Sequence, residues 1–160
     1  MAVSSCRRAA GPRRPAEGGS PAAPSRFAPG HGAGAIVHIA GQGPFRDGDL
    51  EHVGRIGDEI GVEQARASAV LVTLNVLAQA AAAAELRFGR PALERISCLR
   101  LGVFLNCIDG LGGMDRIADA ASDLVLTALG PKGRHCRTVA GMPVLPMRTS
   151  VEIDGIFLLD

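Results

Sequence analysis

The sequence predicts one α+β domain in which a mixed β-sheet carries two helices on one face. Residues 96–106 alternate apolar and other side chains with period two, residues 62–86 and 115–129 show helical spacing, and short β-rich runs flank them. The predicted order is β-β-α-β-α-β-β. Because helices cover only one sheet face, we expect self-association to bury the other, with a half-solvated sheet as the alternative.

Length and composition fit a single globular domain that follows an N-terminal segment rich in Arg and Pro. The chain has 160 residues, 47% hydrophobic and 21% charged, which is enough for one core. The first 30 residues hold five Arg and five Pro against one acidic residue. Such a segment buries too little apolar surface to offset chain entropy. We therefore predict a disordered Arg/Pro/Ala-rich tail over residues 1–26 and one domain over residues 27–160.

The first half of the domain predicts a strand, a turn and a long helix. Residues 35–40 (AIVHIA) form a β-rich run between glycines, and Asp47-Gly48 favours a hairpin returning through residues 50–53. Residues 62–86 then predict a helix that ends at Gly89. Its expected buried stripe consists of Val70, Leu74, Leu77 and Ala81, with Leu71, Ala78 and Ala82 alongside.

The second half predicts strand, helix and two further strands. In residues 96–106, Leu99, Leu101, Val103 and Leu105 share one face. Residues 115–129 predict a helix stopped by Gly130-Pro131, and residues 134–140 and 150–158 are strand candidates. Asn75, inside the first helix, is expected to be a buried structural hydrogen-bonding residue.

Composition excludes several functions and locations. Basic (17) and acidic (16) residues nearly balance and aromatics are only 3%, which disfavours a nucleic-acid-binding module. The four His and four Cys have no metal-ligand spacing, and Gly30–Gly34 precedes a strand instead of following one, so we expect no metal and no cofactor. With no membrane span expected, we predict a cytoplasmic protein; an organellar targeting role for the tail is the alternative.

A basic strand segment is the main candidate for chemistry. On a strand, His135 and Arg137 project to one face. A guanidinium in an apolar sheet needs a partner because an unpaired buried charge is costly. One possibility is an internal ion pair with Glu152 or Asp154. The other is that Arg137 holds a substrate carboxylate while Glu152 positions a water. Spacing alone leaves both open.

Five motifs in order resemble a known family. They are IVHIAGQGPF with RDG, GRIGDEIGVEQARASAVLVTLNVLAQ, HCRTVAGMPV, LP and VEIDGIF. Together they resemble the RidA/YjgF family, also called the endoribonuclease L-PSP or reactive-intermediate imine deaminase family. The resemblance covers about residues 27–159, and it identifies the chain as a divergent member.

The resemblance implies a chorismate-mutase-like fold, a homotrimer with clefts between subunits, and hydrolysis of 2-aminoacrylate-type enamines or imines to 2-keto acids and ammonia without a cofactor. It assigns the substrate carboxylate to Arg137 and the attacking water to Glu152. Backbone contacts to the substrate are implied at Gly41 and Val139. An iminium carbon is already electrophilic, so orienting the substrate and placing one water suffice.

Several positions depart from the family pattern. Phe27 stands where the family has an active-site Tyr, Ala40 where it has Ser, and Asp119 where it has Asn, so polar contacts are lost or changed. His135 replaces an apolar residue and is a candidate replacement donor or base. The alternative function is therefore a non-catalytic trimeric binder of small carboxylates or keto acids, and endoribonuclease activity is less favoured because phosphate contacts need clustered cations.

Overall fold

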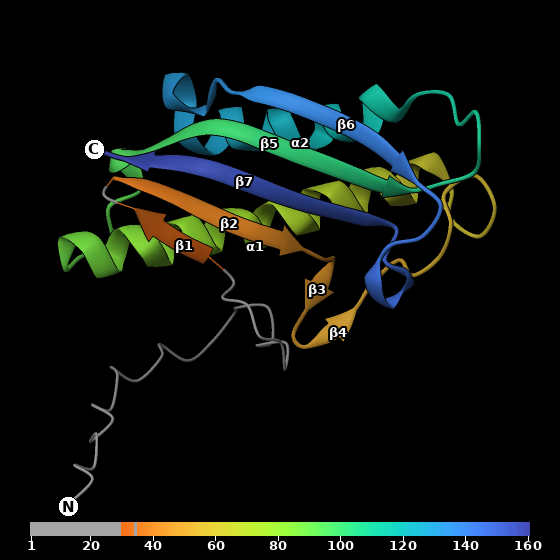
Figure 1. Ribbon diagram of the computed structural model, residues 1–160, viewed down its shortest axis with the longest axis horizontal. Coiled ribbons are helices and arrows are strands. Elements are labelled where there is room, and N and C mark those ends of the chain that lie inside the picture. Colours follow the sequence, from red (N-terminus) through yellow and green to blue (C-terminus); the bar gives the residue numbers. More distant parts are fainter. Residues whose placement is uncertain (1–29, 34) are drawn as a thin grey trace, which may run out of the picture.

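A five-stranded mixed sheet carries both long helices on one face (Figure 1). The structure is a computed structural model that describes residues 30–33 and 35–160. The sheet order is β1-β2-β7-β5-β6. Its strands are β1 (Gly30–Ala33), β2 (Ile36–Gln42), β5 (Ile96–Asn106), β6 (Cys136–Met142) and β7 (Val151–Leu159), and its helices are α1 (Val62–Phe88) and α2 (Met114–Leu129). This confirms the predicted α+β class. The predicted tail and Phe27 lie outside the described residues.

The connection from β5 to β6 determines where α2 lies. These two strands are parallel, and every other pair in the main sheet is antiparallel. Parallel neighbours need a crossover, which α2 supplies, so this helix packs beside β5 and the edge strand β6. Helix α1 packs against β7 and β2 instead. Short 3-10 turns complete the described elements: Leu93–Arg95, Gly130–Gly133 and Pro146–Arg148.

The predicted hairpin exists but does not join the main sheet. Strands β3 (Phe45–Arg46) and β4 (Asp49–Leu50) pair only with each other. Their turn residues Asp47 and Gly48 both have positive φ, as a tight two-residue hairpin requires. In the main sheet β2 instead pairs with β7 and with β1, a preceding strand that was not predicted from the sequence. The predicted structural role of Asn75 is confirmed, because its side-chain amide donates to the carbonyls of Gly43 and Phe45, both at 3.0 Å.

Helix α1 buries only part of the predicted stripe: Leu71 and Leu77 are buried as expected. Val70 and Leu74, expected in the core, are 37% and 48% exposed. The helix is apolar almost all round, so its pattern could not identify the inner face. Small residues line that face and allow close packing on the sheet: Ala65, Ala69, Val72, Val76, Ala80 and Ala84.

By length and hydropathy alone, α1 also meets the criteria for a membrane-spanning helix, contrary to the sequence expectation. More than half of its most apolar stretch is buried within the protein. A core helix of a soluble domain has the same properties, and the packing of α1 on β7 and β2 accounts for its composition.

Strand alternation separates a core face from an uncovered face. On β7, Val151, Ile153 and Phe157 are fully buried against the helices, while the residues between them are half-buried on the other side. In β5 the register shifts between Cys98 and Arg100, which leaves Leu99 39% exposed instead of buried as predicted. Among the described residues, no helix covers the second face (Figure 1). Its side chains include Ile36, His38, Arg100, Phe104, Glu152, Asp154, Ile156 and Leu158.

Gly133 fixes the entry into β6. A Cβ atom added there would lie 2.6 Å from the Val125 carbonyl oxygen and 2.9 Å from the Leu126 Cα atom, both in the backbone of α2. Gly133 is itself buried. Only glycine therefore lets the chain pass this close to α2 before β6 begins.

We predict that Gly133→Ala destabilises the protein by about 1–3 kcal/mol, because the clash is with backbone that cannot rotate away. Gly112→Ala is the matched control, since a Cβ there meets nothing within 4 Å. Urea denaturation of both variants measures the free energy of unfolding. Equal stabilities of the two variants would contradict the packing described for Gly133.

Candidate functional site

Arg137 is held at the open edge of the sheet by two groups on α2. Its Nη1 atom lies 2.9 Å from the Asp119 carboxylate and donates to the Ser122 hydroxyl at 2.9 Å. The side chain of Arg137 is 22% exposed and that of Asp119 is 57% exposed. The Nε and Nη2 atoms have no hydrogen-bond partner in the part of the chain that the structure describes. One edge of the guanidinium is therefore satisfied internally, while the other is available.

His135 and Ser122 continue this hydrogen-bonded cluster. The Nδ1 atom of His135 lies 2.6 Å from the Gly133 carbonyl oxygen, and its Nε2 atom lies 3.0 Å from the Ser122 hydroxyl. A carbonyl only accepts, so Nδ1 carries a proton. The Ser122 oxygen accepts from Arg137, and in the tautomer with a proton on Nδ1 alone, Nε2 accepts from the Ser122 hydroxyl.

Strand register places this cluster on the helix side of the sheet. Arg137 pairs with Leu101 of β5, which is fully buried in the core. Paired residues of parallel strands point to the same face, so Arg137 points toward α2. Asp119 and Ser122 are three residues apart on α2 and therefore share one helix face. Val139, two residues further along β6, packs against the same core.

Glu152 lies in a second cluster, beside a bulge in β2. Between Ile39 and Gln42, β2 has one residue more than β7, and the bulge contains Ala40 and Gly41. The Glu152 carboxylate lies directly over Gly41, where an added Cβ atom would come within 2.7 Å of the carboxyl carbon Cδ. Burial, and secondarily the nearby Asp154, raise the pKa of Glu152 above its ordinary value of 4.5.

Asp154, the acidic residue next to Glu152, already has an ion-pair partner. Asp154 lies 3.2 Å from Nη1 of Arg100, so it forms an ion pair within the uncovered face. Glu152 has no ion-pair partner among the described residues. Its carboxylate is therefore the one in this cluster that is free to bind a water or a ligand.

The two predicted catalytic residues point to opposite faces of the sheet. Glu152 pairs with Phe104 on the uncovered face, whereas Arg137 pairs with Leu101 on the helix face. Side chains from opposite faces of one sheet cannot converge on one small ligand. A site containing both must therefore combine groups from two copies of the chain.

The predicted site residues thus divide into two groups. The structure brings Arg137, Asp119, His135 and Val139 together on one side, and Glu152, Gly41 and Ala40 on the other. Of the two alternatives left open for Arg137, an internal ion pair does form, but Glu152 and Asp154 were the wrong partners, because the carboxylate is that of Asp119. The sequence analysis missed Ser122. Its position three residues after Asp119 on a predicted helix was the available signal.

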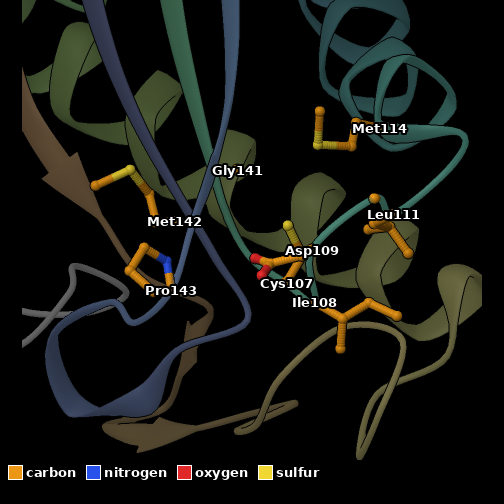
Figure 2. A pocket seen from close by; sticks show the side chains of 9 residues that line it. Cys107, Ile108, Asp109, Leu111, Met114, Gly141, Met142 and Pro143 are labelled. Carbon is orange, nitrogen blue, oxygen red and sulfur yellow. The ribbon is translucent and has the colours of Figure 1, made fainter.

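A pocket of about 240 Å³ opens where β5 and β6 end (Figure 2). Apolar side chains and backbone from three segments line it, with Asp109 as its carboxylate: Cys107 to Leu111, Met114, and Gly141 to Pro143. None of the predicted site residues lines this pocket. Among residues 30–33 and 35–160, no group of three or more His, Cys, Asp or Glu side chains is placed to hold a metal ion.

The part of the chain that matches known proteins includes both clusters. A protein-family model described as "YjgF/chorismate mutase-like, putative endoribonuclease" matches residues 9–157. The Trypanosoma cruzi protein TCP17 is 31% identical over 130 residues, which is 80% of this chain and 78% of that protein. The structure of Atu1372 from Agrobacterium tumefaciens, of unknown function, has a TM-score of 0.78 at 32% identity over 85% of this chain and 83% of that one. The structure of E. coli TdcF with bound serine has a TM-score of 0.62 at 19% identity, covers 88% of this chain and 94% of that one, and shows the fold alone.

We predict that the free energy of unfolding of the Glu152→Gln variant rises relative to that of the wild type as pH increases. Because the pKa of Glu152 is raised on folding, its contribution to stability is complete below the ordinary value of 4.5 and is lost as pH rises through the folded-state pKa. Glutamine does not ionise, so the variant does not lose this contribution as pH rises. The free energy of unfolding should be compared at about pH 4 and about pH 8, with Glu85→Gln, at an exposed position on α1, as the control for loss of charge. A stability difference that stays constant or falls with pH would contradict the raised pKa.

Proposed function

The chain belongs to the YjgF/chorismate mutase-like family, and from this premise we propose that it hydrolyses small enamine or imine acids of the 2-aminoacrylate type to 2-keto acids and ammonia. The observation that carries the proposal is the open Nε–Nη2 edge of Arg137. Two parallel N–H groups match the two oxygens of a carboxylate, and the internal contacts at Nη1 hold the guanidinium in place for them.

The proposed site includes two copies of the chain. One copy supplies Arg137 from its edge strand β6, and a second supplies Glu152 from its uncovered face. The raised pKa of Glu152 makes its carboxylate a better proton acceptor than an ordinary one. The Arg137 of one subunit orients the substrate while the Glu152 of another orients the attacking water. A homotrimer with clefts between subunits fits this requirement.

Hydrolysis then needs little from the protein. Water adds to the electrophilic imine carbon and passes a proton to Glu152. Glu152 returns this proton to the nitrogen of the carbinolamine, which loses ammonia as its hydroxyl becomes the keto group. Substrates of this kind are small α-substituted carboxylic acids. The serine bound in the E. coli TdcF structure is of the same size and carries the same carboxylate.

A second candidate function is binding of small carboxylates without catalysis. It is favoured by Ala40, which leaves the bulge near Glu152 without a hydroxyl, and by Asp119, which competes for Arg137. Ribonuclease activity, named in the family description, has less support. RNA phosphates need clustered unpaired cations, whereas the arginines of the described surface largely form ion pairs: Arg46, Arg90, Arg100, Arg137 and Arg148.

We predict that Arg137→Lys lowers kcat/KM about 10- to 100-fold, because Lys keeps the charge but loses the two-pronged hydrogen bond. Arg116→Lys, at an exposed position on α2, is the matched control. The assay measures keto acid and ammonia released from 2-aminoacrylate generated in situ by a serine dehydratase. No acceleration by the wild-type protein over buffer, together with binding of 2-ketobutyrate, would support the non-catalytic binder instead.

We predict that Asp119→Asn tightens binding of 2-ketobutyrate by up to about fivefold, because it removes a competing anion while its amide oxygen still accepts from Arg137. Titration calorimetry measures the affinity, and Asp123→Asn, an exposed position on the same helix, is the control. Unchanged or weaker binding would show that the open edge of Arg137 is not the carboxylate site.

A further inference from the structure

Ser122 and His135 have the geometry of an activated nucleophile. The hydroxyl lies 3.0 Å from Nε2 of His135, within reach for proton transfer, and the Gly133 carbonyl fixes the ring through Nδ1 at 2.6 Å. A nucleophile, a base and a third group that orients the base make up the arrangement by which serine is activated in enzymes. We propose that Ser122 is a nucleophilic serine that accepts acyl groups from small esters, with His135 as its general base.

The hydroxyl of Ser122 has a different kind of hydrogen-bond partner from other hydroxyls inside the helices. Thr127, on the same helix, donates to the carbonyl of Asp123 at 2.7 Å, and Thr73 on α1 donates to Ala69 at 2.7 Å. Mid-helix hydroxyls ordinarily bond in this way to the preceding turn. Ser122 instead forms its hydrogen bond outside the helix, with the imidazole of His135, and donates in the tautomer with the proton on Nδ1. Its proton is thus directed at a base.

Arg137 supplies the positive charge that the reaction needs. Its Nη1 donates to the Ser122 oxygen at 2.9 Å, so the guanidinium lies next to the point where negative charge develops during attack. Nη2, which has no hydrogen-bond partner among the described residues, is on the same planar group, and we assign it as the donor to an oxyanion on the attacked carbon. Asp119 also contacts Nη1, at 2.9 Å, and so helps to hold the guanidinium in place.

The cluster is accessible to a substrate. It lies between α2 and β6, the strand at the edge of the sheet (Figure 1). Ser122 and His135 are both half-buried, neither sealed in the core nor fully solvated. Both side chains therefore keep partial contact with solvent at the edge of the sheet.

The reaction balances without a further reactant. The Ser122 oxygen attacks the carbonyl carbon of the ester and forms a C–O bond, and its proton passes to Nε2 of His135. The tetrahedral intermediate expels the alkoxide, which takes that proton from His135 and leaves as the alcohol. Water, deprotonated by His135, then attacks the acyl-serine, releases the acid and restores the hydroxyl of Ser122.

The test is chemical labelling of the full-length protein with a fluorophosphonate probe, followed by peptide mass analysis. We expect one adduct, on Ser122, and a matching acetyl adduct after brief exposure to p-nitrophenyl acetate. His135→Gln should slow labelling at least about 100-fold, since it removes the base. Thr127→Ala, which removes the other hydroxyl of α2, should label at the wild-type rate.

Absence of an adduct on Ser122, or equal labelling rates in wild type and His135→Gln, would overturn the proposal. Because the modified residue is identified in the wild-type protein, the result does not depend on whether a Ser122→Ala variant folds. The proposal goes beyond the imine hydrolysis proposed above and shares with it Arg137 and the Asp119 and Ser122 contacts that hold the guanidinium. Labelling does not measure deamination, so either proposal can fail while the other holds.

Discussion

Both long helices lie on the same face of the sheet, and this constraint determines where each reactive group points. Strand residues alternate between two faces, so β6 directs Arg137 toward α2 while β7 directs Glu152 toward the uncovered side. Within one chain the two clusters therefore lie on opposite sides of the sheet. The proposed function for this reason requires a second copy, whose uncovered face would lie at the edge strand of the first.

The environment of Arg137 combines a structural role with the function that we propose for this residue. Asp119 and Ser122 both use Nη1, which ties the edge strand to α2 and offsets the cost of placing a charge beside the core. The same contacts leave Nε and Nη2 directed away from the helix partners. A guanidinium held at one end and open at the other is pre-organised for a carboxylate, because less side-chain freedom is lost on binding.

Much of the fold could be predicted from local patterns, since strand alternation and turn residues act over short distances. The strand over residues 96–106 and the turn at Asp47 and Gly48 are found as predicted. The inner face of α1 was not predictable, because residues such as Val70 and Leu74 are as apolar as those in the core. Strand β1 was missed because its sequence, GHGA, contains few strand-forming residues.

The candidate site could likewise be predicted only in part. Neighbours along one element were accessible to sequence reasoning, as with His135 and Arg137 on one face of a strand. Partners from another element were not, because the Arg137–Asp119 pair depends on how α2 crosses back to β6, which no local pattern specifies. Spacing along the chain also could not reveal that Glu152 and Arg137 face opposite ways, because that depends on the pairing of three strands.

Subunit complementation tests most directly whether the site is built from two copies. Arg137→Ala and Glu152→Gln chains, each inactive alone on 2-aminoacrylate, would be unfolded, mixed and refolded together. The two-copy arrangement predicts that the mixture regains hydrolysis, since some clefts then combine an intact Arg137 from one chain with an intact Glu152 from the other. Mixed assemblies that form but stay as inactive as the separate variants would contradict it.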